Sequence, residues 1–367
     1  MKSIQQWGII LAVLAIILVA VAGCTGNSEN SAAGIPGTSV PSALAGTGNA
    51  QATGQACTPV TITQSDGTNV TLPCRPERII VTNSDAAEML IALGAADNIV
   101  GVTDTTANVS YLMEKLPNAE NIGNWQTPNI EKMLSLKPNV VISYASSRPK
   151  NIDQILAANI TVISLDCYRL PTLPSDARAA GILTGHEQRA EEYAETVENA
   201  TALVRDRVSA LPQDQYPEVY FEGYSDLTAA GPGSGSDELL TIAGGKNIAA
   251  NLLTSSAKVS AEWVVSEKPA YVLKVISAKE TRSFSQIAEL MENRTGWDTI
   301  PAVQQHRVYL FANGIEYGPK SFIGLLSTAK ILHPDLFTDI DPVRLRDEYA
   351  AEYVSGTNTT EAVYPEG

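Results

Sequence analysis

Histidine is scarce in this chain of 367 residues, which contains only three. His186, His306 and His333 lie far apart, and neither a G-x-S-x-G elbow nor an H-E-x-x-H motif occurs. No other motif couples a nucleophile to a base, so the sequence favours a protein that is not an enzyme. Sites for bare zinc or manganese usually depend on imidazole, so the scarcity also argues against a binder of the free ions.

Basic residues are outnumbered, with 25 Lys plus Arg against 40 Asp plus Glu and a net charge of −15. Such a surface repels a phosphate backbone, so we expect no nucleic-acid partner. None of the four cysteines forms a C-x-x-C pair, which argues against a structural zinc site. At 44% hydrophobic residues, the chain is long enough for two domains with proper cores.

The N-terminus has the pattern of an export signal over residues 1–24. A basic start and an apolar run are followed by V-A-G-C ending at Cys24, which resembles a lipobox and makes Cys24 the lipid-modified first residue of the mature protein. The alternative is an uncleaved membrane anchor, since about 17 apolar residues is the lower limit for a spanning helix. Residues 25–56 are rich in Gly, Ser, Ala and Thr, which predicts a flexible tether that holds an extracytoplasmic body near the membrane.

A β-hairpin is expected at the start of the folded part, because two alternating stretches flank Asp66-Gly67, a two-residue turn signal. The hairpin would bring Cys57 near Cys74, and an oxidising compartment would let them pair. Two unpaired thiols are the alternative. Cys167 is then left over, and we expect it to be buried or near a cleft. The hairpin strands are predicted at residues 60–63 and 69–72.

Short apolar runs alternate with helical stretches on both sides of the chain's middle, which predicts an α/β fold with mainly parallel sheets. Strands are expected at residues 79–82, 99–102, 140–143 and 161–165, and then at 219–221, 271–275 and 307–311. Helices are expected at residues 86–93, 130–136 and 152–157, and then at 237–243, 261–265, 284–294 and 321–332.

One long helix is predicted over residues 186–211, which contain no Pro or Gly and repeat apolar residues at a spacing of three and four. At ~1.5 Å per residue it would be roughly 36 Å long. We expect a rigid strut joining two lobes; one long helix inside a single large domain is the alternative. The expected division is an N-terminal lobe at 57–178, a connecting region at 179–211, a C-terminal lobe at 212–340, and a C-terminal helix and tail at 341–367.

Two sequence stretches are echoed across this helix. EKMLSLKPNVV from Glu131 and EWVVSEKPAYV from Glu262 share Glu, Ser, Lys, Pro and Val at equal offsets. EMLIALG from Glu88 and ELLTIAG from Glu238 form a second pair in the same order. The two echoes together indicate a duplicated architecture.

A series of motifs, taken in order, resembles the cobalamin and ferric-siderophore class of substrate-binding proteins of ABC importers. The resemblance covers about residues 66–337 and implies a class III fold, in which two similar α/β lobes are joined by a single long α-helix. It further implies a membrane-tethered monomer without a cofactor, which captures a metal chelate in the cleft between its lobes and delivers it to a permease with its ATPase. The alternative is a surface sensor or adhesin of the same fold without a transport role. The motifs are PERIIV at 76–81, KP at 137–138, GILTG at 181–185, AGGKNI at 243–248, VSAE at 259–262 and RVY at 307–309.

The resemblance gives a role to the echoed glutamates. Members of the class present one surface Glu per lobe to arginines of the permease, and Glu131 and Glu262 match those positions. Each could instead be an acidic residue that the helix dipole favours in a first turn. A single strut between the lobes also leads us to expect small tilts on ligand binding rather than a wide closure.

The ligand is expected beyond the carboxyl ends of the strands. Flat aromatic faces suit a macrocycle or an aromatic chelator, and basic side chains suit an anionic complex, so we rank a ferric siderophore first, cobalamin second and haem third. Trp125 and Tyr144 match positions where the class places aromatic side chains against the ligand, although each Tyr could be a half-buried core residue. The candidates are Asn83, Ser84, Asp104, Trp125, Tyr144, Arg148, Tyr168 and Arg169 in the first lobe, and Tyr224, Asn313, Tyr317 and Lys320 in the second.

Overall fold

The computed structural model describes residues 57–277, 279–354 and 363–365, all within one compact unit, Gln55–Gly367. The export signal, Cys24 and the tether therefore lie outside the described residues. Within those ranges, no helix has the length and apolar character needed to span a bilayer.

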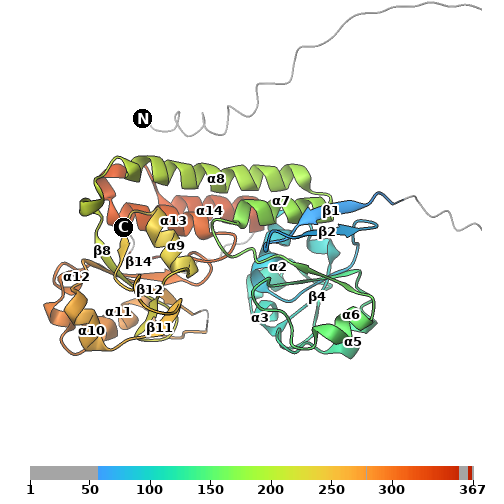
Figure 1. Ribbon diagram of the computed structural model, residues 1–367, viewed down its shortest axis with the longest axis horizontal. Helices are drawn as coiled ribbons and strands as arrows, with labels where there is room; N and C mark the ends of the chain where they lie inside the picture. The colour runs from blue at the N-terminus through green and yellow to red at the C-terminus, as the bar shows by residue number, and fades with distance from the viewer. Residues whose placement is uncertain (1–56, 278, 355–362, 366–367) are drawn as a thin grey trace, which may run out of the picture. The chain divides into compact units, whose positions relative to one another are not determined.

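The N-terminal lobe is built on a five-stranded parallel sheet in the order β5-β4-β3-β6-β7 (Figure 1). Every residue of β3, β4 and β6 is buried, as expected for strands covered on both faces. The strands are β3 Ile79–Val81, β4 Ile99–Val102, β5 Glu120–Asn121, β6 Val140–Ser143 and β7 Thr161–Ser164. The helices are α2 Ser84–Ala92, α3 Asp104–Ala107, α4 Ser110–Met113, α5 Ile130–Ser135 and α6 Ile152–Ala157.

The C-terminal lobe has a mixed seven-stranded sheet in the order β11-β9-β8-β12-β13-β14, with β10 also paired to β8. Strands β10, β8, β12 and β13 are parallel, and β9, β11 and β14 run antiparallel to their neighbours. The strands are β8 Glu218–Glu222, β9 Thr228–Ala230, β10 Lys246–Asn247, β11 Ser256–Lys258, β12 Tyr271–Ile276, β13 Val308–Ala312 and β14 Val363–Tyr364. The helices are α9 Gly235–Ile242, α10 Ala261–Glu267, α11 Phe284–Glu292, α12 Pro301–Gln304, α13 Ser321–Leu332 and α14 Pro342–Tyr349.

Part of the strand arrangement is repeated in the two lobes, as the sequence echoes predict. In the N-terminal sheet β3 lies between β4 and β6, and in the C-terminal sheet β8 pairs with β12 on one side and with β10 and β9 on the other. The echo at Glu88 and Glu238 falls on α2, which follows β3, and on α9, which follows β8 and β9. The echo at Glu131 and Glu262 falls on α5 and α10, which directly precede the parallel strands β6 and β12.

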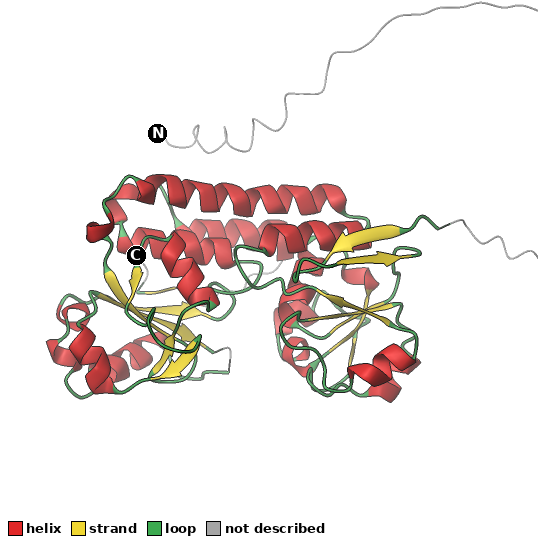
Figure 2. Cartoon of the chain, viewed as in Figure 1, coloured by secondary structure: helices red, strands yellow, loops and turns green. Residues whose placement is uncertain are grey.

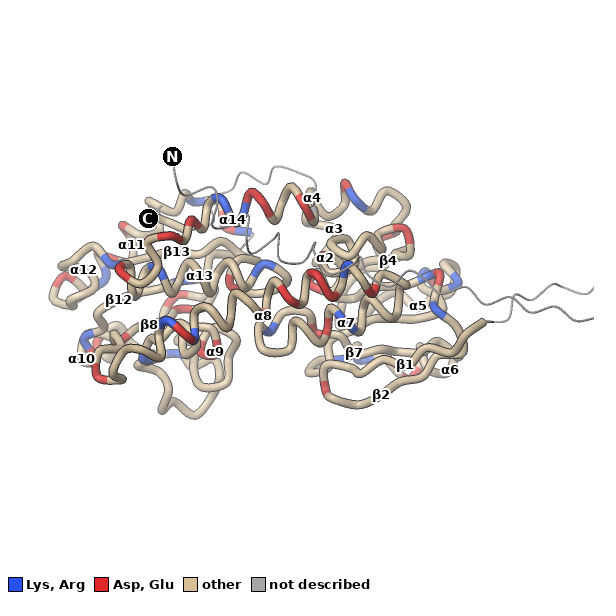
Figure 3. Tube along the Cα trace, turned by 90° about the horizontal axis from the view of Figure 1, so that it is seen from above, with Lys and Arg blue, Asp and Glu red and all other residues tan. Residues whose placement is uncertain are grey.

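The long helix is α8, Glu187–Ser209, and α7, Leu173–Thr184, folds back against it (Figures 1 and 3). A Cβ at Gly181 would lie 2.4 Å from the Cβ of Ala190, so glycine permits this close approach. The expected boundary between residues 178 and 179 is therefore wrong, since it falls inside α7. The buried stripe of α8 agrees with the prediction and contains Ala190, Tyr193, Ala194, Val197, Ala200, Val204 and Val208.

The C-terminal segment adds a second contact between the lobes. After α14, the π-helix η6, Ala350–Val354, reaches back to α8 and α2. The ring of Tyr353 lies 5.7 Å from that of Tyr193, and the Tyr349 hydroxyl donates to Glu88 over 3.3 Å. The chain then returns to the C-terminal lobe, where β14 pairs with β13. This return was not predicted.

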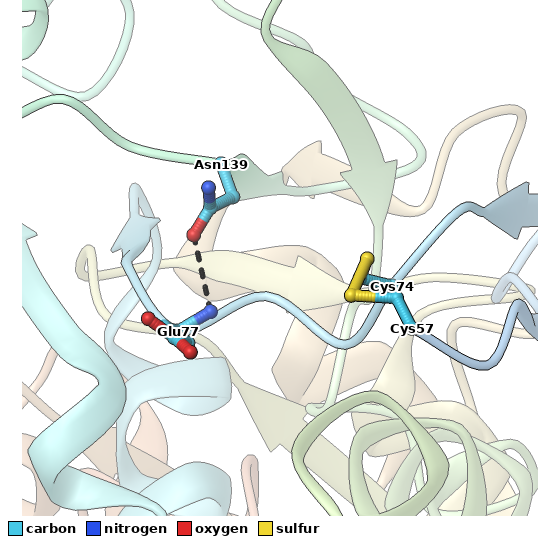
Figure 4. The surroundings of a disulfide bond; sticks show 4 residues. All are labelled: Cys57, Cys74, Glu77 and Asn139. Atoms are coloured by element: carbon cyan, nitrogen blue, oxygen red, sulfur yellow. Dashed lines mark hydrogen bonds between the residues drawn. A yellow bond between two sulfur atoms is a disulfide. The ribbon is translucent and has the colours of Figure 1, made fainter. Parts of the chain in front are cut away.

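A disulfide joins Cys57 to Cys74 at the open end of the N-terminal hairpin, with a Cα–Cα distance of 5.1 Å (Figure 4). The hairpin strands are β1, Val60–Thr63, and β2, Asn69–Leu72. The expected two-residue turn is wrong, because Gln64 N–H donates to the Thr68 carbonyl over 2.8 Å and the loop inside that bond holds three residues. Closing a loop of this size by a disulfide stabilises a fold by about 3 kcal/mol.

Candidate functional site

Three aromatic rings gather at the carboxyl ends of the N-terminal strands. Tyr144 follows β6, Tyr168 lies beyond β7, and Trp125 lies in the loop before α5. The ring of Tyr144 is 5.9 Å from that of Trp125 and 5.7 Å from that of Tyr168, and both pairs meet edge to face. All three side chains are half-buried, so each keeps part of its surface for contact with another molecule.

Two further tyrosines occupy the corresponding end of the C-terminal sheet. The rings of Tyr224 and Tyr317 lie 6.3 Å apart, and the Tyr224 hydroxyl donates to Asn313 Oδ1 over 2.6 Å. The Tyr317 hydroxyl shares a 2.7 Å hydrogen bond with Ser236 Oγ at the start of α9. A Cβ at Gly235 would lie 2.6 Å from the Tyr317 ring, so the glycine makes room for it.

Asp85 lies where the two lobes meet. It accepts a 2.9 Å hydrogen bond from the Tyr144 hydroxyl, and a Cβ at Gly318 of the other lobe would lie 2.8 Å from its Oδ1. Gly318 N–H also donates to the Tyr168 carbonyl over 3.2 Å. Burial is the main cause that raises the pKa of the Asp85 carboxyl to about 7.

Glu316 is a second acid at this junction, and it is fully buried. It is 2% exposed, and neither of its carboxyl oxygens has a hydrogen-bond partner among the described residues. Burial raises its pKa to about 8, although the nearby hydroxyls of Ser236 and Tyr317 act in the opposite direction. Burial also raises the pKa of Tyr224, with smaller contributions from the charges of Glu316 and Asp85. Asp85 and Glu316 therefore form one electrostatic group with the surrounding tyrosines. We call this group the inter-lobe site; its tyrosines are Tyr144, Tyr168, Tyr224 and Tyr317.

Sequence reasoning missed both acids. Asp85 directly follows the candidates Asn83 and Ser84, and Glu316 directly precedes Tyr317. Their positions in the sequence were the available signal, but neither a carboxylate in a first helical turn, as Asp85 is, nor one in a loop, as Glu316 is, gives a sign of its burial.

Stability should fall as pH rises through the range set by Glu316. The unfolded carboxyl ionises near pH 4.5, whereas the folded one keeps its proton until about pH 8, so folding is penalised progressively between these values. We expect Glu316→Gln to flatten the decline in melting temperature between pH 5 and pH 8. The exposed Glu289→Gln serves as the matched control and should follow the wild-type curve. Parallel curves for Glu316→Gln and wild type would contradict the prediction.

Two of the predicted ligand cations take part in ion pairs between the lobes. Arg169 contacts Glu238 on α9 through two nitrogens, with Nε to Oε2 at 3.2 Å. Lys320 Nζ lies 3.0 Å from Glu88 Oε1 on α2 and donates to the Tyr111 hydroxyl over 3.0 Å. Since Glu88 and Glu238 occupy equivalent places in the duplicated lobes, the ion pairs are reciprocal.

The side chains of Arg148 and Asp104 contact residues outside the inter-lobe site. Arg148 faces the hairpin, where its guanidinium lies 3.9 Å from Asp66 and donates to Ser164 Oγ over 3.1 Å. Asp104 accepts a 3.0 Å hydrogen bond from the amide of Asn121. All three basic residues expected to meet an anionic complex are thus paired with carboxylates of the protein.

Asn83 is a structural residue, contrary to its predicted role. It is 1% exposed and caps α2, where its Oδ1 accepts from Ala86 N–H over 2.6 Å and its amide donates to the Leu165 carbonyl over 3.1 Å. Its polar groups are therefore not available to a ligand. Ser84 beside it is half-buried, and Cys167 is fully buried, which raises the pKa of its thiol.

The two glutamates with a predicted docking role occupy matching places. Glu131 is the second residue of α5 after the N-cap Asn129, and Glu262 is the second residue of α10 after the N-cap Ser260. Both side chains are exposed. Figure 1 shows α5 and α10 on the side of the lobes away from α8.

Residues 79–313 match a family model described as periplasmic binding protein. The uncharacterized ABC transporter substrate-binding lipoprotein YvrC of Bacillus subtilis is 27% identical, over 77% of this chain and 88% of that protein. The molybdate-binding protein MolA of Haemophilus influenzae is 26% identical, over 80% of this chain and 90% of its own. A vitamin B12-binding protein of Yersinia pestis is 27% identical, over 56% of this chain and 71% of its own.

Solved structures share the fold. A periplasmic solute binding protein of Veillonella parvula superposes with a TM-score of 0.68 at 23% identity, covering 82% of this chain and 95% of that chain. The periplasmic vitamin B12 binding protein of Vibrio cholerae gives 0.59 at 21% identity, covering 70% and 97%. The two-lobed class III architecture is thereby established.

Within the described ranges, no three or more His, Cys, Asp or Glu side chains are grouped to hold a metal ion.

Proposed function

Because this chain belongs to the periplasmic binding protein family, which its residues 79–313 match, we propose that it captures a metal chelate at the inter-lobe site for an ABC importer. Proteins of this family bind solutes and are not enzymes, and the chain is accordingly an extracytoplasmic binding protein. The single observation that carries the proposal is the convergence of aromatic rings from both lobes around Asp85. Half-buried rings at the ends of parallel strands suit a flat macrocyclic ligand.

The charges of the site support a chelate of low net charge. A ferric siderophore ranked first because Arg148, Arg169 and Lys320 could meet an anionic complex, but each is paired with a carboxylate. Asp85 and Glu316 add two acids and no positive charge. We therefore place cobalamin ahead of a ferric siderophore and haem, and all three ahead of an oxyanion such as molybdate. The relative from Yersinia pestis named for vitamin B12 supports this order.

Titration of the purified protein tests the proposal. We expect cyanocobalamin to quench the fluorescence of Trp125, and a Trp125→Phe variant to lose that response. Tyr144→Ala should weaken binding at least about tenfold, because a lost aromatic contact costs on the order of 1.4 kcal/mol. Arg148→Ala is the control and should bind as the wild type does. Ferric siderophore, haem and molybdate are titrated in parallel, and a protein that binds none of the three chelates would refute the proposed ligand class.

The N-terminal segment is proposed to anchor the protein. The V-A-G-C pattern at Cys24 and the lipoprotein name of the Bacillus relative support lipidation. The mass of the mature protein decides between a lipidated chain that begins at Cys24 and an uncleaved leader. In either form the partners are the membrane, the chelate and the permease with its ATPase, and the protein acts as a monomer.

A further inference from the structure

A separate cavity of about 310 Å³ lies in the C-terminal lobe. Tyr271 is the first residue of β12 and Arg307 directly precedes β13, so the cavity is at the amino ends of these parallel strands. The inter-lobe site lies beyond the carboxyl ends of the same sheet. Residues of α13, α14 and β14 complete the lining, and Figure 2 shows these elements around that part of the sheet. The volume is at the lower end of the range for small-molecule sites.

Two tyrosine rings form one wall of the cavity. The rings of Tyr271 and Tyr309 are stacked, with centroids 6.5 Å apart and planes inclined by 26°. Neither hydroxyl has a hydrogen-bond partner within the described part of the chain. Apolar side chains of Ile331, Val343 and Val363 also line the cavity, together with Ser327 and Arg346. The cavity is therefore shaped for a flat ring and offers two phenol groups at its edge.

Positive charge gathers at this cavity in a chain whose net charge is −15. The guanidinium of Arg307 lies 4.8 Å over the Tyr271 ring and forms no ion pair with any described residue. Lys330 Nζ donates to the Ile340 carbonyl over 2.8 Å and likewise has no described carboxylate partner. Half-buried cations without counter-charges lose hydration and gain little in return, so an anion in the cavity would be stabilised by both.

We propose that this cavity binds a flat organic anion, namely an aromatic ring that carries a carboxylate or sulfonate group. The ring packs beside Tyr271 and Tyr309, and the anionic group lies between Arg307 and Lys330. None of these four residues belongs to the inter-lobe site, so the proposal does not depend on the ligand captured there. The protein would then hold two ligands of different chemistry at opposite ends of one sheet.

Calorimetric titration of the purified full chain with naphthalene-2-sulfonate tests the cavity, with 2-naphthol as the neutral probe of the same ring. The sulfonate should bind at least about tenfold more tightly than the naphthol, because hydrogen bonds to a charged group are stronger than those to a neutral group. Arg307→Gln and Lys330→Gln should each weaken sulfonate binding, and the double change should weaken it at least tenfold. Arg307→Lys keeps the charge and should retain part of the affinity, which separates charge recognition from a folding defect.

Several results would overturn the proposal. They are equal binding of both probes, unchanged sulfonate affinity in the Arg307→Gln, Lys330→Gln protein, and no sulfonate binding at millimolar concentration. A Tyr144→Ala variant should bind the sulfonate as the wild type does, and loss of binding there would place the probe at the inter-lobe site instead. Because the chelate titration reports on the inter-lobe site alone, either proposal can fail while the other stands.

Discussion

Replacing Glu131 and Glu262 together by alanine is expected to lower chelate uptake at least about tenfold, because complementary charges fix the register of a protein on its partner. Both carboxylates are exposed at the second position of a helix, in equivalent places on two similar lobes. They can therefore contact two equivalent arginines of a two-fold permease. Uptake of labelled ligand by cells that carry the importer measures the effect. The affinity of the purified variant for its ligand should not change.

A matched control separates docking from general surface charge. Glu114 and Glu289 are also exposed, one in each lobe, and their double replacement by alanine removes the same net charge. That variant should transport normally. If the glutamates only complement the dipoles of α5 and α10, their loss would cost about 0.3–1 kcal/mol of stability at each helix and leave uptake intact. Normal uptake in the Glu131→Ala, Glu262→Ala cells would thus refute docking.

Much of the fold could be predicted because its central strands are buried on both faces and form continuous apolar runs. Residues 99–102, 140–143 and 152–157 agree with β4, β6 and α6 at both ends. The prediction for 321–332 agrees with α13 in the same way. The echoes also predicted which elements correspond, since α2 and α9, like α5 and α10, hold equivalent places in the two lobes.

Elements that depend on tertiary contacts could not be predicted. Helix α7 contains Gly181, which looks like a helix breaker in sequence but is required by the approach of Ala190 from α8. Strand β14 has two residues, too few to show any periodicity, and it exists because β13 offers a free edge. The three-residue turn of the hairpin was missed because Thr68 extends the ladder by pairing with Gln64.

The candidate site shows the same division. The order of strands predicted that Tyr144, Tyr168 and Tyr317 lie beyond strand ends, because the carboxyl ends of parallel strands share one edge. Whether a basic side chain is paired with a carboxylate of the protein could not be inferred, since Arg169 contacts a partner 69 residues away in the sequence. Its ion pair belongs to the contact between the lobes and only exists once both lobes are folded.

Glu88→Gln is expected to cost about 3–5 kcal/mol of unfolding free energy, because it leaves the buried Lys320 without the carboxylate that it contacts. The side chains of Lys320 and Glu88 are 12% and 7% exposed. The equivalent change Glu238→Gln should cost about 1 kcal/mol or less, since Arg169 and Glu238 are 37% and 21% exposed and water screens them. Denaturant unfolding of both variants measures the two costs, and the duplicated fold makes each the control of the other.

Removing both members of the buried pair tests the cause. Glu88→Gln combined with Lys320→Met eliminates the unpaired charge, so this protein should be more stable than Glu88→Gln alone. Its radius of gyration, measured by small-angle X-ray scattering, should also be larger than that of the wild type, because the reciprocal ion pairs hold the lobes together. The increase should be small, since α8 and η6 limit the tilt of the lobes. Equal losses of unfolding free energy in Glu88→Gln and Glu238→Gln would show that burial does not determine how much each ion pair contributes to stability. Lost chelate affinity in Lys320→Met at unchanged stability would instead make Lys320 the ligand residue that the sequence predicted.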